Sequence, residues 1–158
     1  MAHASMALLL RVYDQAFTAP AWHGTPLGGA LRGVTPRAAL RRPGRGRHNI
    51  WEMTLHLAYW KYVVRRRLTG DKTLNFPRVG SNWLPLPARR DAKAWKADVA
   101  LLREQHELLR AVIARFPVAQ LRRRGWRSKW TNEEHIYGVA SHDLYHAGQI
   151  QLIKRLVG

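Results

Sequence analysis

Apolar residues recur at intervals of three or four positions in four segments of the chain, and this spacing predicts amphipathic helices. The predicted helices cover residues 5–18, 49–69, 89–116 and 131–156, and none of these ranges contains a proline. Gly70 follows the second range, as glycine often does directly after a helix. Thr131 and Glu134 begin the fourth range with the spacing of a capping box, which marks a helix start.

Proline and glycine are concentrated in residues 19–47 and 71–88, which predicts two long loops. Within the first loop, Thr35 followed by Pro36 predicts a short helix of about two turns. No segment alternates apolar and polar residues over a convincing length, and the sequence has no internal repeat. We therefore expect an all-α fold, a four-helix bundle, formed as a single domain by residues 1–158.

The composition is that of a protein with a real core. Hydrophobic residues make up 46% of the sequence and include seven tryptophans. No apolar run approaches the roughly 20 residues that span a bilayer, so we expect a soluble, cytoplasmic protein without a membrane partner. Because the sequence has no cysteine, it has neither disulfides nor thiolate ligands. A transition-metal site would have to use histidine and carboxylate side chains.

The charge is extreme: 27 lysines and arginines stand against 10 acidic residues, a formal net charge of +17. Such an excess favours contact with nucleic acid, acidic membranes or anionic small molecules. The arginines are dispersed along the chain, however, and no zinc-finger or RNA-recognition pattern is present. Nucleic acid is therefore not the expected partner, and a solvated basic surface is the simpler interpretation.

Two histidines in the stretch "SHDLYHAGQI" are candidate metal ligands. His142 and His146 lie about 40° apart on a helix and roughly 6 Å apart along its axis, so both imidazoles can reach one ion. They share the helix face of Ile150 and Ile153, which predicts burial. The alternative is a pair of core or surface histidines whose hydrogen bonds are satisfied by water or backbone.

A third ligand is expected from the helix over residues 49–69. His56 lies on a face with apolar and aromatic residues, including Trp60, and points inward. His48 lies about 12 Å earlier along the helix axis, too far to share one ion with His56, and His135 is two turns from His142 and fails on the same distance. His48 is expected at the helix start, and it is the substitute ligand if that helix begins later. The remaining histidines are expected at the surface or in loops: His3, His23 and His106.

Three imidazoles leave coordination positions open, which is typical of a catalytic rather than a structural metal site. Glu52 could orient His56 or act as a base, with a helix salt bridge to a loop arginine as the alternative. Gln149 could bond a water at the metal. Trp60 and Trp83 are candidate walls of a pocket above it, unless they are simply core residues.

Several motifs resemble those of the DinB-like family of bacterial DNA-damage-inducible proteins. They are "PAWHGTPLGGAL" at 20–31, "HNIWEMTLHLAYWKYVVRRRLTG" at 48–70, "PRVGSNWLPLP" at 77–87 and "SHDLYHAGQIQLIKRL" at 141–156. The resemblance implies a four-helix bundle, often a homodimer, with a divalent metal, zinc or nickel, held by His56, His142 and His146. It covers nearly the whole chain.

The resemblance also implies a class of chemistry, which is not DNA repair. Relatives include metal-dependent transferases of low-molecular-weight thiols, so we expect thiol transfer to a small electrophilic substrate. Arg66 and Arg67 are candidates for binding carboxylates of either reactant. The alternatives are a metal-dependent hydrolase and a non-catalytic basic stress-response module that binds an anionic partner. A third alternative is a helical bundle that binds nucleic acid and in which the histidines are only core residues.

Overall fold

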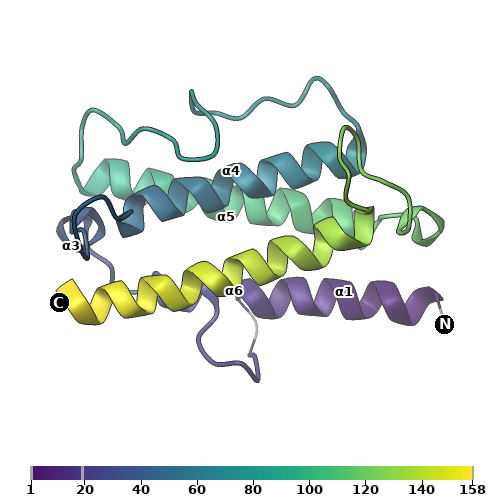
Figure 1. The fold of residues 1–158 in the computed structure, drawn as a ribbon, viewed down its shortest axis with the longest axis horizontal. Coiled ribbons are helices and arrows are strands. Elements are labelled where there is room, and N and C mark those ends of the chain that lie inside the picture. The colour runs from purple at the N-terminus through teal and green to yellow at the C-terminus, as the bar shows by residue number, and fades with distance from the viewer. Residues whose placement is uncertain (1, 19, 158) are drawn as a thin grey trace.

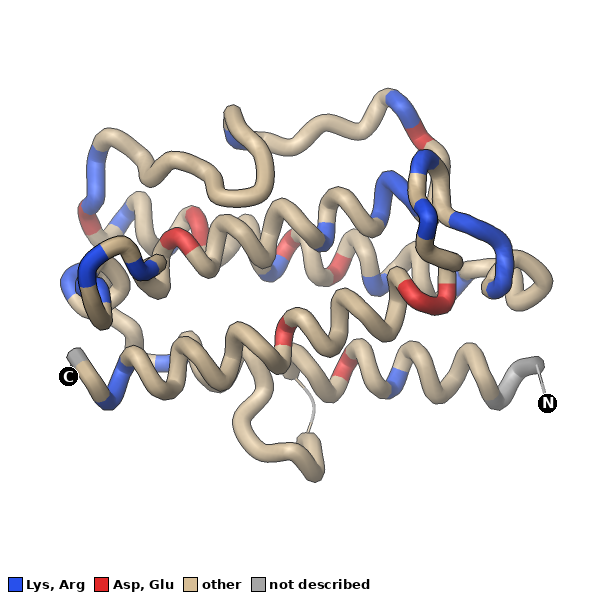
Figure 2. The backbone as a smooth tube through the Cα atoms, in the orientation of Figure 1, with Lys and Arg blue, Asp and Glu red and all other residues tan. Residues whose placement is uncertain are grey.

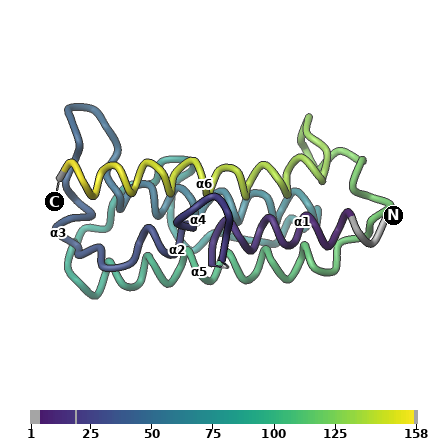
Figure 3. Tube along the Cα trace, turned by 90° about the horizontal axis from the view of Figure 1, so that it is seen from below, coloured from purple at the N-terminus to yellow at the C-terminus, as the bar shows by residue number. Residues whose placement is uncertain are grey.

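The computed structural model describes residues 2–18 and 20–157, with side chains for 5–18 and 20–156. The elements are α1 (Ala2–Phe17), α2 (Leu27–Ala30), α3 (Pro36–Leu40), α4 (Ile50–Thr69), α5 (Ala92–Ala114), the 3-10 helix η1 (Val118–Gln120) and α6 (Asn132–Val157). Figures 1 and 3 show α1, α4, α5 and α6 lying side by side along the long axis. The expected all-α bundle of four long helices is confirmed.

The direction of the helices explains the longest loop. α4 and α5 run in the same direction, and α1 and α6 run in the opposite one (Figure 1). Residues 70–91 must therefore return the chain along the bundle, and they cross the outer side of α4. Leu84 of this loop is buried in the core, and the Tyr62 hydroxyl donates to the Leu74 carbonyl oxygen at 2.9 Å.

The long helices begin and end where local chemistry favours it. Asn49 and Glu52 form a capping box at the start of α4, and Gly70 ends that helix with a left-handed φ of 68°. Thr131 and Glu134 exchange hydrogen bonds at the start of α6, as their spacing predicts. The short helix α3 begins after Thr35 as expected, whereas α2 was not predicted from the sequence.

The core consists of two apolar clusters with a polar layer between them. One cluster gathers α2, α3 and the start of α4 around the end of α6, and the other gathers α1, the end of α4 and the start of α6. Between them, Lys61 of α4 and Asp143 of α6 are both fully buried and pair at 2.5 Å. This ion pair joins the two helices that carry the candidate metal ligands.

His106 was predicted at the surface, and that prediction is wrong. Its side chain is 1% exposed and lies between the rings of Tyr13 and Phe17. His106 occupies the same face of α5 as Leu102 and Leu109, so the apolar spacing of that helix carries it into the core.

The positive charge is spread over the molecule. Figure 2 shows lysines and arginines in the loops at both ends of the bundle as well as along the helices. One end carries the arginine-rich loop of residues 41–47, and the other carries the loop of residues 121–131. No helix among those described is long and apolar enough to cross a membrane.

Candidate metal centre

The three predicted histidines converge from two helices. His56 comes from α4, and His142 and His146 come from α6. The Nε2 atom of His142 lies 3.1 Å from the Nε2 atom of His56 and 3.1 Å from that of His146. One nitrogen from each of the three rings lies within 4.8 Å of the other two. We call these residues the histidine triad.

The hydrogen bonds around the triad fit a bound cation. His56 Nδ1 lies 3.0 Å from the carbonyl oxygen of Asn82, which can only accept, so Nδ1 carries the proton and Nε2 is bare. His142 Nε2 has two imidazole nitrogens at hydrogen-bond distance and can donate to only one of them. Converging lone pairs without enough protons suit a metal ion, and the two separations of 3.1 Å are close to those of nitrogen atoms that share one ion at metal–nitrogen distances of about 2.1 Å.

Burial keeps the triad neutral. Loss of solvation lowers the pKa of His56 to about 4, although its bond to Asn82 opposes this shift. Burial and the neighbouring imidazoles lower the pKa of His142 to about 3. Burial also lowers the pKa of His146. Neutral imidazole is the form that binds a metal, so the site holds its ligands ready near neutral pH.

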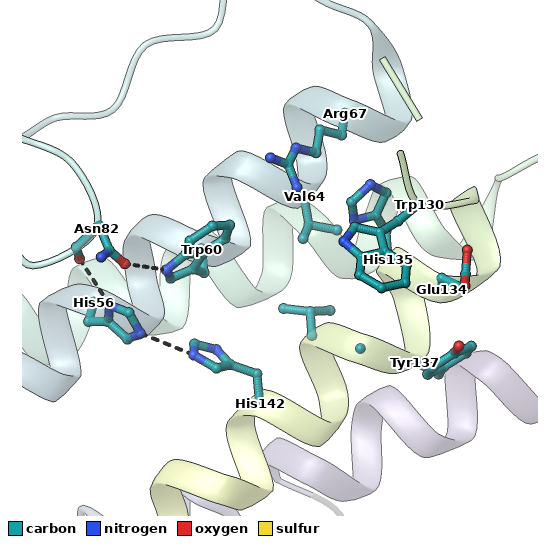
Figure 4. A pocket seen from close by; sticks show the side chains of 12 residues that line it. His56, Trp60, Val64, Arg67, Asn82, Trp130, Glu134, His135, Tyr137 and His142 are labelled. Carbon is teal, nitrogen blue, oxygen red and sulfur yellow. Dashed lines mark hydrogen bonds between the residues drawn. The ribbon is translucent and has the colours of Figure 1, made fainter. Parts of the chain in front are cut away.

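The long loop after α4 orients His56. Asn82 has a left-handed φ of 56°, which asparagine tolerates better than most residues, and its carbonyl faces His56 Nδ1. The Asn82 side-chain oxygen accepts a hydrogen bond of 3.0 Å from Trp60 Nε1 (Figure 4). Trp83 then stacks on His56 at a centroid distance of 3.9 Å and on His48 at 3.5 Å. Sequence patterns do not point to Asn82, because its role depends on the conformation of the loop.

Glu52 is occupied elsewhere. Its carboxylate accepts hydrogen bonds from the Arg42 side chain and from the backbone N–H of Asn49. It also pairs with His48 Nδ1 at 3.1 Å. Burial alone would raise the pKa of Glu52, but these hydrogen bonds lower it. The predicted orientation of His56 by Glu52 is therefore wrong, because Asn82 supplies that contact. The alternative salt bridge to a loop arginine is present, and the proposed role of Glu52 as a base stays a prediction.

Gln149 lies beside the triad. Its side chain favours protonation of His146 and so opposes the effect of burial. The buried Gln149 Oε1 and His146 Nδ1 have no partner within strict hydrogen-bond geometry among the described residues. Closing this contact would fix the proton on His146 Nδ1 and turn Nε2 toward the other two rings. A contact of Gln149 with a metal-bound water stays a prediction.

Two cavities adjoin the triad from opposite sides. The first, which we call the Trp60 cavity, has a volume of about 560 Å³ and is lined by α4 from His56 to Arg67 and by α6 from Glu134 to His142 (Figure 4). The second, which we call the basic-loop cavity, measures about 780 Å³ and is lined by residues 43–48, by Trp83 and by α6 residues from Tyr145 to Leu156.

Because α4 and α6 run in opposite directions, these lining residues place the cavities on either side of the triad along the bundle. His56 and His142 face the Trp60 cavity, and His146 faces the basic-loop cavity. Trp60 and Trp83 line one cavity each, in agreement with their predicted place as pocket walls. Of the two arginines singled out from the sequence, Arg67 lines the Trp60 cavity and Arg66 does not.

The other histidines whose side chains the structure describes stay outside the triad, and the side chain of His3 is not among those described. His135 Nε2 lies 2.8 Å from the Ser128 hydroxyl oxygen. Although His135 lines the Trp60 cavity, it is not in the group whose nitrogens could share one ion. His48 bonds Glu52 at the start of α4, as its position predicts.

Comparison with known proteins supports the family resemblance. The family model described as the DinB superfamily matches residues 25–150, which is most of the chain and includes all three triad histidines. No curated protein sequence matches the chain, and no solved structure does.

Proposed function

The chain belongs to the DinB superfamily, and on that premise we propose that it is a divalent-metal enzyme that transfers a low-molecular-weight thiol to a small electrophilic substrate. The placement of the triad between two cavities carries this proposal. A transfer reaction joins two organic molecules, and each needs its own space beside the reacting atoms. A hydrolase needs one organic substrate and a water molecule, so a second large cavity would serve no purpose.

The triad would hold the metal through His56, His142 and His146. A bound divalent metal lowers the pKa of a coordinated thiol or water and polarises a carbonyl group. Imidazole ligands suit zinc and nickel, and equally copper and iron. Asn82 would keep the bare Nε2 of His56 directed at the ion, and Gln149 would do the same for His146.

The charges of the basic-loop cavity suit the thiol. Arg45 and Arg47 line this cavity and form no ion pair with any described carboxylate, so both guanidinium groups are available to an anion. Low-molecular-weight thiols commonly carry carboxylates, which arginine binds in bidentate fashion. We therefore assign the thiol to the basic-loop cavity and the electrophile to the more apolar Trp60 cavity, whose walls include Val64 and Val139.

At the electrophilic carbon, the reaction makes one bond and breaks one. The thiol gives its proton to solvent or a base, and its sulfur forms a C–S bond with the electrophilic carbon. The leaving group departs with the electron pair of the bond that breaks. Excluding water from the two cavities would favour attack by sulfur over attack by hydroxide.

Rates with and without a thiol test the proposal. Protein loaded with zinc or nickel would be mixed with chlorodinitrobenzene and either cysteine or glutathione, and separately with p-nitrophenyl acetate alone. We expect conjugate formation that requires both metal and thiol and that is lost in His142→Ala but retained in the control His23→Gln, because His23 is exposed and lines neither cavity. Metal-dependent ester cleavage without thiol, and no conjugate, would contradict transfer and favour a hydrolase.

The homodimer that the family resemblance implies stays a proposal, and α6 offers a surface for it. Tyr145, Leu152 and Leu156 are each more than half exposed and lie within about 40° of one another on the helix. The same three side chains line the basic-loop cavity, so a second copy of the chain that buries this apolar stripe would also cover one side of the proposed thiol site. Light scattering of the parent and of Leu152→Glu tests it: the parent should be dimeric and the variant monomeric, whereas a monomeric parent contradicts the proposal. A cytoplasmic location likewise stays a prediction.

A further inference from the structure

A third cavity, away from the triad, is lined by arginines and aromatic rings. It measures about 460 Å³ and lies where α4, the long loop after it and the loop of residues 121–131 meet. Its arginines are Arg66, Arg67, Arg78 and Arg127, and its aromatic residues are Tyr59, Tyr62, Phe76 and Trp126. No acidic residue and none of the triad histidines lines it. We call it the arginine cavity.

Three of the four arginines form no ion pair within the described part of the chain. Arg78 pairs with the buried Asp98, but Arg66, Arg67 and Arg127 form no ion pair with a described carboxylate. Hydrogen bonds from Thr73 lower the pKa of Asp71, with a smaller contribution from Arg65 and Arg66, and Asp71 does not line the cavity.

Like charges gathered in one cavity repel one another, and this cost is removed when an anion binds between them. Arg66 supports this interpretation further, because its Nε is buried and has no hydrogen-bond partner in the described part of the chain. A buried donor without a partner is unfavourable and is expected to be satisfied by a ligand or water.

The aromatic residues hold the arginines in place and provide a surface for stacking. The Arg66 guanidinium carbon lies 5.2 Å from the centre of the Trp126 ring, and that of Arg127 lies 4.8 Å from it. The backbone N–H of Trp126 donates to the Arg67 carbonyl oxygen at 2.9 Å, which ties the loop of residues 121–131 to the end of α4. Phe76 contacts the rings of both Tyr59 and Tyr62.

We propose that the arginine cavity binds a phosphate monoester that carries an aromatic ring, such as a nucleoside monophosphate. A phosphate monoester carries close to two negative charges at neutral pH and offers three acceptor oxygens, which suits several guanidinium groups better than one carboxylate does. The ring would stack on Tyr59 or Phe76, which line the cavity and are half-buried, as bases do on aromatic side chains. The cavity volume is within the usual range for small-molecule sites, about 300–1,000 Å³.

Calorimetric titration with AMP and adenosine tests this site. The protein would be treated with chelator first, so that the result does not depend on a metal or on the proposed transfer reaction. We expect AMP to bind at least about tenfold more tightly than adenosine, and its affinity to fall as salt is raised. Equal affinities, or no measurable binding of AMP, would overturn the proposal.

Variants locate the site. Arg66→Gln and Arg127→Asn should each weaken AMP binding about five- to tenfold and leave adenosine unaffected, and asparagine at 127 accepts the left-handed φ of 49° found there. Arg122→Gln is the matched control, because Arg122 is exposed on the same loop but does not line the cavity. Thermal melting would verify that all variants fold. An equal loss in the control would mean general charge attraction and would overturn the proposal.

Discussion

His106 occupies an unusual environment for a histidine. The ring is stacked at 4.5 Å from the Tyr13 ring centre and 3.9 Å from that of Phe17, and its Nδ1 has no hydrogen-bond partner among the described residues. Burial, helped by the positive charges of Lys61 and Arg110, lowers the pKa of His106 to about 2. The folded protein therefore holds this side chain neutral, whereas the unfolded chain protonates it below about pH 6.5.

This difference in pKa should make stability depend on pH. Between the folded value of about 2 and the unfolded value of about 6.5, the unfolded chain binds more protons, so His106 lowers the free energy of unfolding as the pH falls. We expect His106→Phe to reduce the slope of unfolding free energy against pH by about 1 kcal/mol per pH unit between about pH 4 and 6. Urea denaturation at several pH values measures it, and parallel slopes for parent and variant would contradict the shifted pKa.

Single residues also show what the sequence could and could not reveal about the site. The triad histidines were predictable, because helix geometry places His142 and His146 on one face and places His56 on the apolar and aromatic face of the other helix, and the family motif implies the same three residues. The role of Asn82 was not predictable, because Asn82 is 26 residues from His56 in the sequence and its carbonyl reaches the ring only through the conformation of a long loop. His106 could have been assigned to the core, since Leu102 and Leu109 flank it at helical spacing.

At the scale of elements, the buried pair of Lys61 and Asp143 joins α4 to α6 close to the triad. Both side chains are fully buried, so each charge depends on the other: burial lowers the pKa of Lys61 and raises that of Asp143, and the attraction between them opposes both shifts. The pair also lies between the two apolar clusters of the core. Removing one partner would leave the other charge uncompensated.

We expect Lys61→Met to lower the free energy of unfolding by about 3–5 kcal/mol, and the double variant Lys61→Met, Asp143→Leu to recover much of that loss. The control is Arg110→Met, which breaks the more exposed pair with Asp14 at 2.7 Å and should cost less than about 1 kcal/mol. Urea denaturation of the four proteins provides the comparison. If Lys61→Met costs no more than Arg110→Met, the buried pair does not stabilise the bundle.

The helices were predictable to different degrees for local reasons. The four long ones have a repeated apolar face, and Gly70 and Thr131 mark the end of α4 and the start of α6. α2 has only four residues, includes two glycines and lacks a side-chain cap, so nothing local distinguishes it from a loop. It forms because Leu27 and Ala30 are buried against the bundle, which is a tertiary effect.

At the scale of the whole molecule, the net charge of +17 is distributed rather than gathered on one face. The arginine-rich loops lie at opposite ends of the bundle, where they contribute to two different cavities: residues 43–47 to the basic-loop cavity and Arg127 to the arginine cavity. This distribution suits small anions bound at separate places. The proposed transfer reaction depends, however, on the histidine triad being a metal site.

The metal content of the purified protein tests that claim most directly. Protein purified without an affinity tag would be measured by inductively coupled plasma mass spectrometry beside the double variant His142→Ala, His146→Ala and the control His135→Gln. We predict about one divalent transition metal per chain in the parent and in the control, and none in the double variant. A parent that contains no such metal and takes up neither zinc nor nickel when either is added would contradict the account.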